Sequence, residues 1–415
     1  MNKRKIINDP IYGFINLYSE FIFDLIEHPY FQRLRNICQL GLSYFVYPGA
    51  THSRFQHSLG AMYLMQNALD TLSEKDIPIT AEEKEATLAA ILLHDIGHSP
   101  FSHALEYFFV KDCSHEDFTR WMIDDLNKLF QGRLDLTLEI VADKYPKAFL
   151  HQLVSSQLDV DRLDYLNRDS FYTGVSEGVI GSERIIKMLN VHNNQLAADI
   201  KAVYSIEKFI ISRRLMYWQV YLHKTVHVAE VILINILRRA RELYGKNKLT
   251  FISPAVRYFF EKERHTEDFT PNGIGLQSYI ALDDNDILFC IKMWKNESDF
   301  ILSYLSNCLY NRKLFKIEVA EQVFDSEYIH EIKQRVKQRY NLSEDECGYF
   351  VIDGIMENRA YNKKLEAIQI LDKNGNPHAL ENISDHLNHR MLSETVNKYF
   401  VCYPKNCTGH KFKSA

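Results

Sequence analysis

The heptapeptide Leu92-Leu93-His94-Asp95-Ile96-Gly97-His98 closes an apolar segment, residues 86–93, with a His-Asp pair. Burying an ionised carboxylate beside such a segment is costly unless the charge has a partner. A divalent metal ion is one such partner, and imidazole and carboxylate are both common metal ligands. Because a lone His-Asp dipeptide is common by chance, a metal site needs further ligands elsewhere in the chain.

Two residues outward from this pair can supply them. His57 lies 37 residues before His94, at the start of an apolar helical pattern, and Asp161 lies 66 residues after Asp95. Two imidazoles and two carboxylates suit Fe, Mn, Zn, Ni or Mg, with positions open for water or substrate.

Composition is that of an ordinary globular protein. The chain has 415 residues, 46% of them hydrophobic and 25% charged, which excludes a mainly disordered chain, a collagen-like chain and a coiled-coil rod. The net charge of −5 neither favours nor excludes a nucleic-acid partner, so any basic site for phosphate has to be local.

Neither a membrane segment nor a secretory leader is predicted. No window holds eighteen uncharged apolar residues, and the basic N-terminus lacks an apolar segment after it. The seven cysteines are odd in number and form no C-x-x-C pair, which favours reduced thiols. We therefore expect a cytoplasmic protein without membrane contact.

Hydrophobic periodicity predicts a mainly α protein. From about residue 56 to 245 the pattern is helical nearly throughout, with one long helix or two abutting helices over residues 204–243. Strands are predicted at residues 314–319, 349–355 and 365–371, the last followed by an Asn-Gly turn. The expected organisation is a large helical domain, residues 1–245, and a smaller α+β part, residues 246–415.

Two helical stripes carry polar side chains. A step of 100° per residue places Asp161, Asp164, Tyr165 and Arg168 within an arc of about 100°. A second stripe spans about 120° of one face and consists of Arg213, Tyr217, Tyr221, Lys224 and His227. Basic and aromatic groups interleaved in this way suit a triphosphate with a stacked base, although a solvated outer face can have the same pattern.

The string His57 … His94-Asp95 … Asp161 resembles the signature of the HD phosphohydrolase superfamily. The likeness extends to residues 9–13, 31–35, 39–41, 47–50, 52–60, 94–103 and 159–169, and covers about residues 5–240. Together these blocks resemble the deoxynucleotide triphosphohydrolase branch, and most closely the catalytic domain of its animal members. This resemblance implies an HD-domain helical core over residues 1–245.

The resemblance also implies site residues. Metal ligands would be His57, His94, Asp95 and Asp161. Active-site histidines would be His98, His103 and His115, with His115 supported by Glu106 as the proton-transferring residue and His103 as its rival. Arg54 would contact the triphosphate. Further substrate contacts would be Arg162, Tyr165, Asp169, Arg213, Tyr221 and Lys224, with Gln39 and Leu40 beside the sugar or base.

Glu27, Gln32 and Arg35 occupy guanine-reading positions of the family's nucleotide-activation site. Glu106 and Glu27 each replace a usual Asp, Arg162 a Lys, and Ser99 a Gly.

The expected reaction is hydrolysis of a phosphate ester or anhydride. The chain has no P-loop, so metal, Arg, Lys and His have to handle phosphate. The resemblance narrows this to dNTP plus water giving deoxynucleoside plus triphosphate, in a homodimer or homotetramer, with a second metal, Mg, on the outer phosphates. Two alternatives stay open: an HD enzyme acting on a monophosphate, cyclic nucleotide or guanosine tetraphosphate, and a nucleotide- or nucleic-acid-binding regulator with a vestigial metal site.

Overall fold

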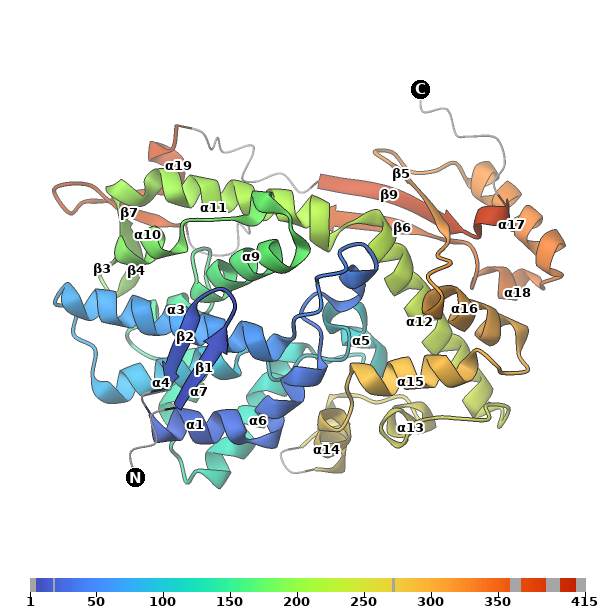
Figure 1. Cartoon of the computed structure of the whole chain (residues 1–415), viewed down its shortest axis with the longest axis horizontal. Helices are drawn as coiled ribbons and strands as arrows, with labels where there is room; N and C mark the ends of the chain where they lie inside the picture. Colours follow the sequence, from blue (N-terminus) through green and yellow to red (C-terminus); the bar gives the residue numbers. More distant parts are fainter. Residues whose placement is uncertain (1–4, 18, 271–272, 359–366, 386–395, 408–415) are drawn as a thin grey trace.

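Helices dominate the structure, which confirms the mainly α class (Figure 1). This computed structural model describes residues 5–17, 19–270, 273–358, 367–385 and 396–407. The helices are α1 (Glu20–Glu27), α2 (Pro29–Gln32), α3 (Arg54–Glu74), α4 (Ala81–Leu93), α5 (Glu106–Phe109), α6 (His115–Leu129), α7 (Asp135–Val141), α8 (Ala148–Val154), α9 (Val160–Thr173), α10 (Ser182–Lys187), α11 (Val203–Met216), α12 (Lys224–Gly245), α13 (Pro254–Glu261), α14 (Ile274–Ile280), α15 (Asp284–Trp294), α16 (Phe300–Tyr310), α17 (Ser326–Tyr340), α18 (Glu344–Cys347) and α19 (Leu380–Ile383). The strands are β1 (Lys5–Asp9), β2 (Gly13–Leu17), β3 (Leu189–His192), β4 (Gln195–Asp199), β5 (Lys316–Ala320), β6 (Ile352–Asn358), β7 (Gln369–Leu371), β8 (Pro377–Ala379) and β9 (Val396–Tyr403).

Helices α3, α4 and α9 form the centre of the helical core, and α3 contacts both others. The contact between α3 and α9 depends on Gly60. A Cβ atom there would lie 2.1 Å from Arg168 Nη2 and 2.2 Å from Asp164 Oδ1. Glycine therefore lets the polar face of α9 lie directly on α3, which is what brings their side chains into one site.

Local sequence fixes where these helices begin. Thr80 and Glu83 form a capping box on α4, and Ser114 and Asp117 form the predicted one on α6. Asp159 caps α9 by accepting from the backbone N–H of Arg162. His115 and Asp161 therefore lie in the first turns of α6 and α9. His94 lies at the other end of α4, where it is the C-cap residue.

Two β-hairpins interrupt the parts expected to be helical or irregular. β1 pairs with β2, and β3 pairs with β4, both antiparallel. The turn of the second hairpin is Asn193-Asn194, with φ angles of 49° and 62°. Asparagine tolerates this left-handed conformation. The Asn193-Asn194 pair therefore indicates a hairpin turn, which the prediction of a nearly continuous helical pattern over residues 56–245 missed.

The C-terminal part is mixed α+β, as predicted. Strands β5, β6 and β7 fall at the three predicted places, although residues 365–366 lie outside the described residues. β5, β9 and β6 form one sheet, whereas β7 pairs in parallel with β4 of the preceding part. This pairing joins the two predicted parts across residue 245. The domain boundary at that residue remains a prediction.

The second of the two predicted alternatives for residues 204–243 is confirmed, because α11 and α12 are separate helices with a π-helical turn, Tyr217–Tyr221, between them. The prediction of one continuous stripe is wrong. The bend directs Lys224 into solvent, and the ring of His227 packs on Phe400 with centroids 4.5 Å apart.

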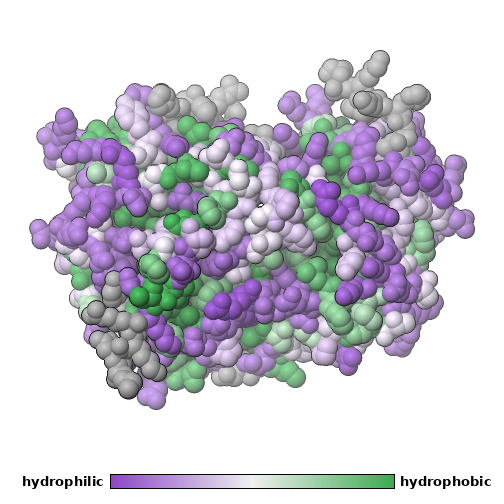
Figure 2. All heavy atoms as spheres, viewed as in Figure 1, coloured by the Kyte–Doolittle hydropathy of each residue, from purple (hydrophilic) through white to green (hydrophobic). Residues whose placement is uncertain are grey.

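In the described part of the chain, no single helix is long and apolar enough to cross a membrane. The segments Ile200–Tyr221 and Lys224–Gly245 meet that criterion only when counted together, with a bend of 54° between them. Figure 2 shows a face covered mostly by hydrophilic side chains, with scattered apolar ones.

Candidate metal centre and active site

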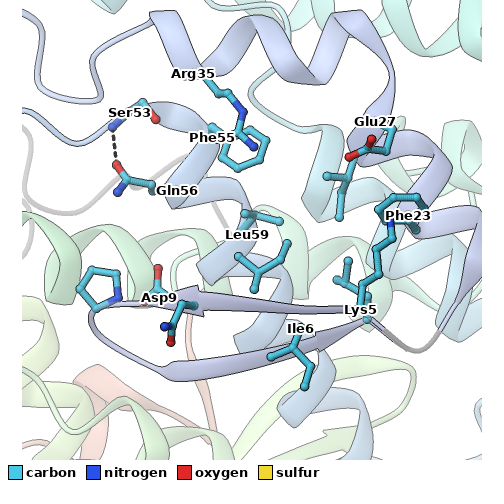
Figure 3. Close-up of a pocket in the computed structure, with 15 residues that line it drawn as sticks. Lys5, Ile6, Asp9, Phe23, Glu27, Arg35, Ser53, Phe55, Gln56 and Leu59 are labelled. Atoms are coloured by element: carbon cyan, nitrogen blue, oxygen red, sulfur yellow. Dashed lines mark hydrogen bonds between the residues drawn. The ribbon is translucent and has the colours of Figure 1, made fainter. Parts of the chain in front are cut away.

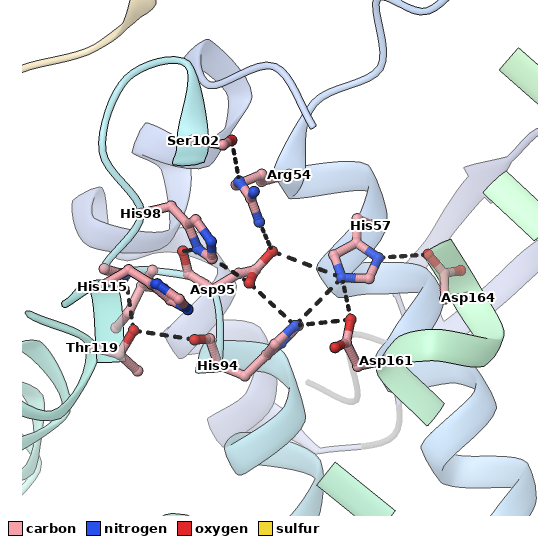
Figure 4. Close-up of polar contacts among 12 residues, drawn as sticks. Arg54, His57, His94, Asp95, His98, Ser102, His115, Thr119, Asp161 and Asp164 are labelled. Carbon is pink, nitrogen blue, oxygen red and sulfur yellow. Dashed lines mark hydrogen bonds and ion pairs between the residues drawn. The ribbon is translucent and has the colours of Figure 1, made fainter. Parts of the chain in front are cut away.

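Three predicted ligands meet where α3, the end of α4 and the first turn of α9 come together (Figure 4). The donor atoms of His57, His94 and Asp161 all lie within 4.8 Å of one another. Asp161 Oδ1 is 3.0 Å from His57 Nε2 and 3.5 Å from His94 Nε2, and the two Nε2 atoms are 3.3 Å apart. Ligands bonded at about 2.1 Å to one ion are separated by about 3 Å or slightly more, so this spacing fits a metal ion.

Both imidazoles are oriented by their other nitrogen. His57 Nδ1 lies 2.8 Å from Asp164 Oδ2, and His94 Nδ1 lies 2.6 Å from the carbonyl oxygen of Ile91. When each Nδ1 donates to its acceptor, each Nε2 presents its lone pair to the cluster, as metal-binding histidines do. Asp164, which the sequence placed on the polar face of α9 without assigning it a role, orients the imidazole of His57.

Asp95 lies beside this cluster. Its Oδ1 is 3.3 Å from His94 Nε2, and its Oδ2 is 3.7 Å from His57 Nε2. Arg54 donates from Nη1 to Asp95 Oδ2 at 2.5 Å and from Nε to Ser102 Oγ at 2.9 Å. The structure thus brings Asp95 and Arg54 to the cluster, while their roles as ligand and phosphate contact remain predictions.

Electrostatics in this buried site favour a bound cation. Burial opposes charge on Asp161, but hydrogen bonds from His57 and His94 hold the pKa of its carboxyl below the usual range. Burial also opposes protonation of His57, yet its hydrogen bonds to Asp161 and Asp164 raise the pKa of the imidazole to about 10. Because imidazole binds a metal in its deprotonated form, metal binding competes with protonation of His57.

A second cluster of histidines lies next to Asp95. His98 Nδ1 is 3.2 Å from Asp95 Oδ1, and the rings of His98 and His115 stack with centroids 4.0 Å apart. His115 Nδ1 and its backbone N–H both bond to Glu106 Oε1, so the predicted imidazole–carboxylate pair is present. Gly97 permits this arrangement, because a Cβ atom there would lie 2.2 Å from the carbonyl oxygen of His115. The side chain of His103 lies outside the described part of the structure, so its role as a rival stays a prediction.

A basic and aromatic cluster follows Asp161 along α9. Burial and the neighbouring Arg213 lower the pKa of Arg162 to about 10, and Arg162 pairs with Asp159. Burial raises the pKa of the Tyr165 phenol to about 12, although the positive charge of Arg213 opposes this shift. Arg162 Nε and Arg213 Nε are buried, and neither has a hydrogen-bond partner among the described residues. Two neighbouring guanidinium groups with unused donors suit an anionic ligand.

The remaining predicted substrate contacts are spread around this cluster. Tyr221 donates to Asp169 Oδ2 at 2.8 Å, and His52 Nε2 lies 2.8 Å from Asp169 Oδ1, so Asp169 is buried in a network that includes an unpredicted histidine. Gln39 and Leu40 are half-buried, and Lys224 is exposed.

A separate pocket of about 460 Å³ lies between the β1–β2 hairpin, α1 and α3 (Figure 3). Glu27 and Arg35, two of the three predicted activator-site residues, line it. Gln32, the third, donates to the carbonyl oxygen of Ile26 and accepts from Arg35 Nε at 2.7 Å. The guanidinium of Arg35 lies 3.6 Å from the ring centroid of Phe55.

Comparison with known families gives two matches along the chain. Residues 54–169 match the HD domain, and residues 180–252 match the HD associated region. The first match begins at Arg54 and ends at Asp169, so it contains His57, His94, Asp95 and Asp161.

Individual relatives extend this likeness. The uncharacterized protein YwfO of Bacillus subtilis is 38% identical over 323 residues, 76% of this chain and 72% of that protein. A deoxynucleoside triphosphate triphosphohydrolase SAMHD1 homolog of Dictyostelium discoideum is 33% identical over 57% of this chain, which spans about half (49%) of that relative's length. A crystal structure described as a phosphohydrolase from Bacteroides thetaiotaomicron superposes with a TM-score of 0.93 at 48% identity, over 97% of this chain and 100% of that one.

Proposed function

This chain belongs to the HD-domain phosphohydrolase family, and from this premise we propose that it hydrolyses deoxynucleoside triphosphates to deoxynucleoside and triphosphate. The observation that carries the proposal is the meeting of three metal-ligand side chains with the His115–Glu106 pair and with two neighbouring guanidinium groups, Arg162 and Arg213, whose Nε atoms have no hydrogen-bond partner among the described residues. These are the three components that hydrolysis of a phosphate ester needs: an ion site, a proton donor and an anion site.

The ion site consists of His57, His94 and Asp161, with Asp95 as the proposed fourth ligand. A divalent ion bound there would supply an activated water and neutralise charge on a phosphate oxygen. Asp164 and the Ile91 carbonyl keep the two imidazoles turned toward the ion position, and a second ion, Mg, would accompany the outer phosphates.

The proposed anion site consists of Arg162 and Arg213, together with Arg54, which contacts Asp95. Charge-assisted hydrogen bonds from guanidinium groups to phosphate are short and directional, so they orient the triphosphate as well as bind it. Tyr165, Asp169, Tyr221, Lys224, Gln39 and Leu40 are the proposed contacts to the rest of the nucleotide.

The reaction adds water oxygen to the α-phosphorus and breaks the bond between that phosphorus and O5′ of the sugar. The departing O5′ needs a proton, and His115 is the proposed donor. Because Nδ1 of His115 bonds to Glu106, the proton available for transfer is held at Nε2. Triphosphate leaves with the oxygen of the attacking water, and the deoxynucleoside leaves with the proton from His115.

The test is incubation with each dNTP and Mn²⁺ or Mg²⁺ in ¹⁸O-labelled water. The proposal expects deoxynucleoside and triphosphate in equal amounts, with one ¹⁸O in the triphosphate and none in the nucleoside. The Asp161→Ala variant should be inactive, and His330→Ala, which changes an exposed histidine on α17, should match wild type. Release of pyrophosphate or of orthophosphate instead would contradict the proposal.

Parallel incubations with deoxynucleoside monophosphates, cyclic nucleotides and guanosine tetraphosphate test the other enzymatic alternative. Turnover of one of these, with dNTPs inert, would reassign the substrate. Nucleotide binding with no turnover of any substrate in the metal-loaded protein would favour the regulator.

We further propose a cytoplasmic homodimer or homotetramer. Phe14, on the β1–β2 hairpin, is 66% exposed, whereas Phe21 packs in the chain's own core. The aromatic N-terminal block thus offers at least one unpaired apolar side chain for a second copy. Light scattering with and without dNTPs tests this, and a monomer under both conditions would contradict it.

A further inference from the structure

The segment that joins α14 to α15, residues 279–284, holds the loop that carries the His-Asp motif. This segment lies outside both family matches, which end at residues 169 and 252. The hydroxyl of Tyr279 donates to the carbonyl oxygen of Gly97 at 2.8 Å, and its ring stacks on Phe118 of α6 with centroids 3.6 Å apart. The segment is therefore packed against both the motif loop, residues 95–101, and the helix that begins with His115.

Arg33 links the same segment to the motif loop a second time. Its Nη1 donates to the carbonyl oxygens of Ile96 and His98, at 3.3 and 2.9 Å. Its Nε and Nη2 both donate to the carbonyl oxygen of Leu282, at 3.1 and 2.8 Å. Arg33 is 6% exposed and Leu282 is fully buried, so water does not compete for these bonds.

Asp284 makes the third link, and it is the one that reaches catalytic groups. Its Oδ1 accepts from the backbone N–H of Phe101 at 2.8 Å, and its Oδ2 accepts from that of Cys38 at 2.9 Å. Cys38 precedes Gln39, a proposed nucleotide contact, and Phe101 precedes Ser102, whose hydroxyl accepts from Arg54 Nε. One carboxylate thus holds two loops, and Ser102 in one of them accepts a hydrogen bond from Arg54.

The loop needs such an anchor. Phe101 and Ser102 have φ angles of 53° and 55°, a left-handed conformation that is unfavourable for residues other than glycine. Two such residues in succession persist only when surrounding contacts hold them. Ser102 Oγ also donates to the carbonyl oxygen of Cys38 at 3.2 Å, which closes a ring of contacts through Asp284.

Burying the carboxylate of Asp284 at this position costs free energy, because a charged group loses its contact with water. Asp284 is 4% exposed and bonds to two neutral backbone amides, and burial raises the pKa of its carboxyl to about 6. Its bidentate geometry, in which each oxygen takes one amide, is what a single apolar or hydroxyl side chain could not reproduce.

We propose that Asp284 is a positioning residue for the active site, which acts by holding Phe101 and Cys38 so that Ser102 aligns the Arg54 guanidinium with Asp95. The inference rests on the proposed function for its kinetic part. It makes α15, in the C-terminal part of the chain, an integral component of a site whose ligands all come from residues 57–161.

The kinetic test compares Asp284→Asn and Asp284→Ala with Asp283→Ala. Asp283 caps α15 by accepting from Asn285 and Asp286, so its removal destabilises the same helix start without touching either loop. We expect a loss of at least 10-fold in kcat per folded molecule for Asp284→Ala, a smaller loss for Asp284→Asn, unchanged metal content in both, and wild-type kcat for Asp283→Ala.

A double-mutant cycle with Ser102→Ala tests the route. If Asp284 acts through Ser102 and Arg54, the double variant should turn over no more slowly than the slower single variant. Multiplicative losses in kcat, or equal kcat in Asp284→Ala and Asp283→Ala, would overturn the proposal.

Amide hydrogen exchange separates this inference from the proposed function, because it needs no substrate. In Asp284→Asn, exchange at Phe101 and Cys38 should accelerate at least 10-fold more than in Asp283→Ala at matched melting temperature. Wild-type exchange at both amides would overturn the inference even in an active enzyme. Accelerated exchange in a protein that does not hydrolyse dNTPs would leave the anchor standing and remove the proposed substrate. Should Asp284→Ala fail to fold, Asp284→Asn carries both measurements.

Discussion

The imidazole ring of His115 stacks on that of His98, with centroids 4.0 Å apart and planes inclined by 27°. His98 in turn contacts Asp95, so the stack connects the start of α6 to the edge of the metal centre. His115 also bonds through Nδ1 to the carboxylate of Glu106. His115 is therefore held on both sides, which suits its proposed role in proton transfer.

His115→Ala should lower kcat for dNTP hydrolysis by about 10²–10⁴-fold, because the departing O5′ loses its proton donor. Metal content and substrate Kd should stay near wild type, and Glu106→Gln should show a milder loss. Steady-state kinetics, elemental analysis and melting temperature on one preparation make the measurement.

His103→Ala run beside it tests the rival donor. Near-normal turnover of a folded, metal-loaded His115→Ala protein would refute the role of His115, and a larger loss in His103→Ala would reassign it.

His57→Ala and Asp161→Ala should remove the bound metal and the activity together, because each deletes a donor from the three-residue cluster. Asp164→Asn should leave the ligands in place but weaken metal affinity by about 10–100-fold, since it removes the acceptor that orients His57. Titration of the apoprotein with Mn²⁺ measures both effects, and elemental analysis of the protein as purified identifies the native metal. Full metal stoichiometry in His57→Ala and Asp161→Ala would contradict the assignment.

Arg213→Gln should raise KM for dNTPs by about 10–100-fold, because a charge-assisted bond to phosphate contributes about 1.5–3 kcal/mol. Arg213→Lys should restore part of the affinity through its charge alone. The adjacent Arg214→Gln gives a control with the same loss of charge. Equal KM values in Arg213→Gln and Arg214→Gln would mean that Arg213 serves only the packing of Tyr165.

Glu83→Gln should lower the free energy of unfolding by about 1.5–3 kcal/mol at pH 7. Burial alone would raise the pKa of this carboxyl, but bonds from Lys147, Thr80 and Tyr145 lower it below the usual value. A carboxyl with a lowered folded-state pKa contributes stability above its unfolded pKa, about 4.3, and loses it as pH falls through the folded value.

Urea unfolding at pH 7, 5 and 4 should therefore show the difference between wild type and Glu83→Gln shrinking toward acid pH. Glu82→Gln changes the exposed neighbour in the same helical turn and should have little effect at any pH. A difference that stays constant across this range would show that the ionised form is not what stabilises α4.

The residues proposed as ligands could be picked out from the sequence because each of them sits in a local pattern. His94 and Asp95 end an apolar run, His57 begins another, and Asp161 follows a capping Asp159. The His115–Glu106 pair, nine residues apart, was predicted from the family resemblance and not from a local pattern. By contrast, the continuous stripe from Arg213 to His227 failed, because the turn at Tyr217–Tyr221 breaks the helical register on which the pattern relied.

The sequence by itself determined the helix starts, the donor types and the polar face of α9, since these depend on neighbours within one or two helical turns. Only the tertiary structure decided which distant elements meet. Gly60 leaves room for Asp164 and Arg168 to pack on α3. β7 pairs with β4, with 172 residues between paired positions in the sequence. Asp284 bonds to the backbone N–H of Phe101, 183 residues away in the sequence. Such contacts depend on packing and on burial that excludes water, and neither leaves a periodic trace in the local sequence.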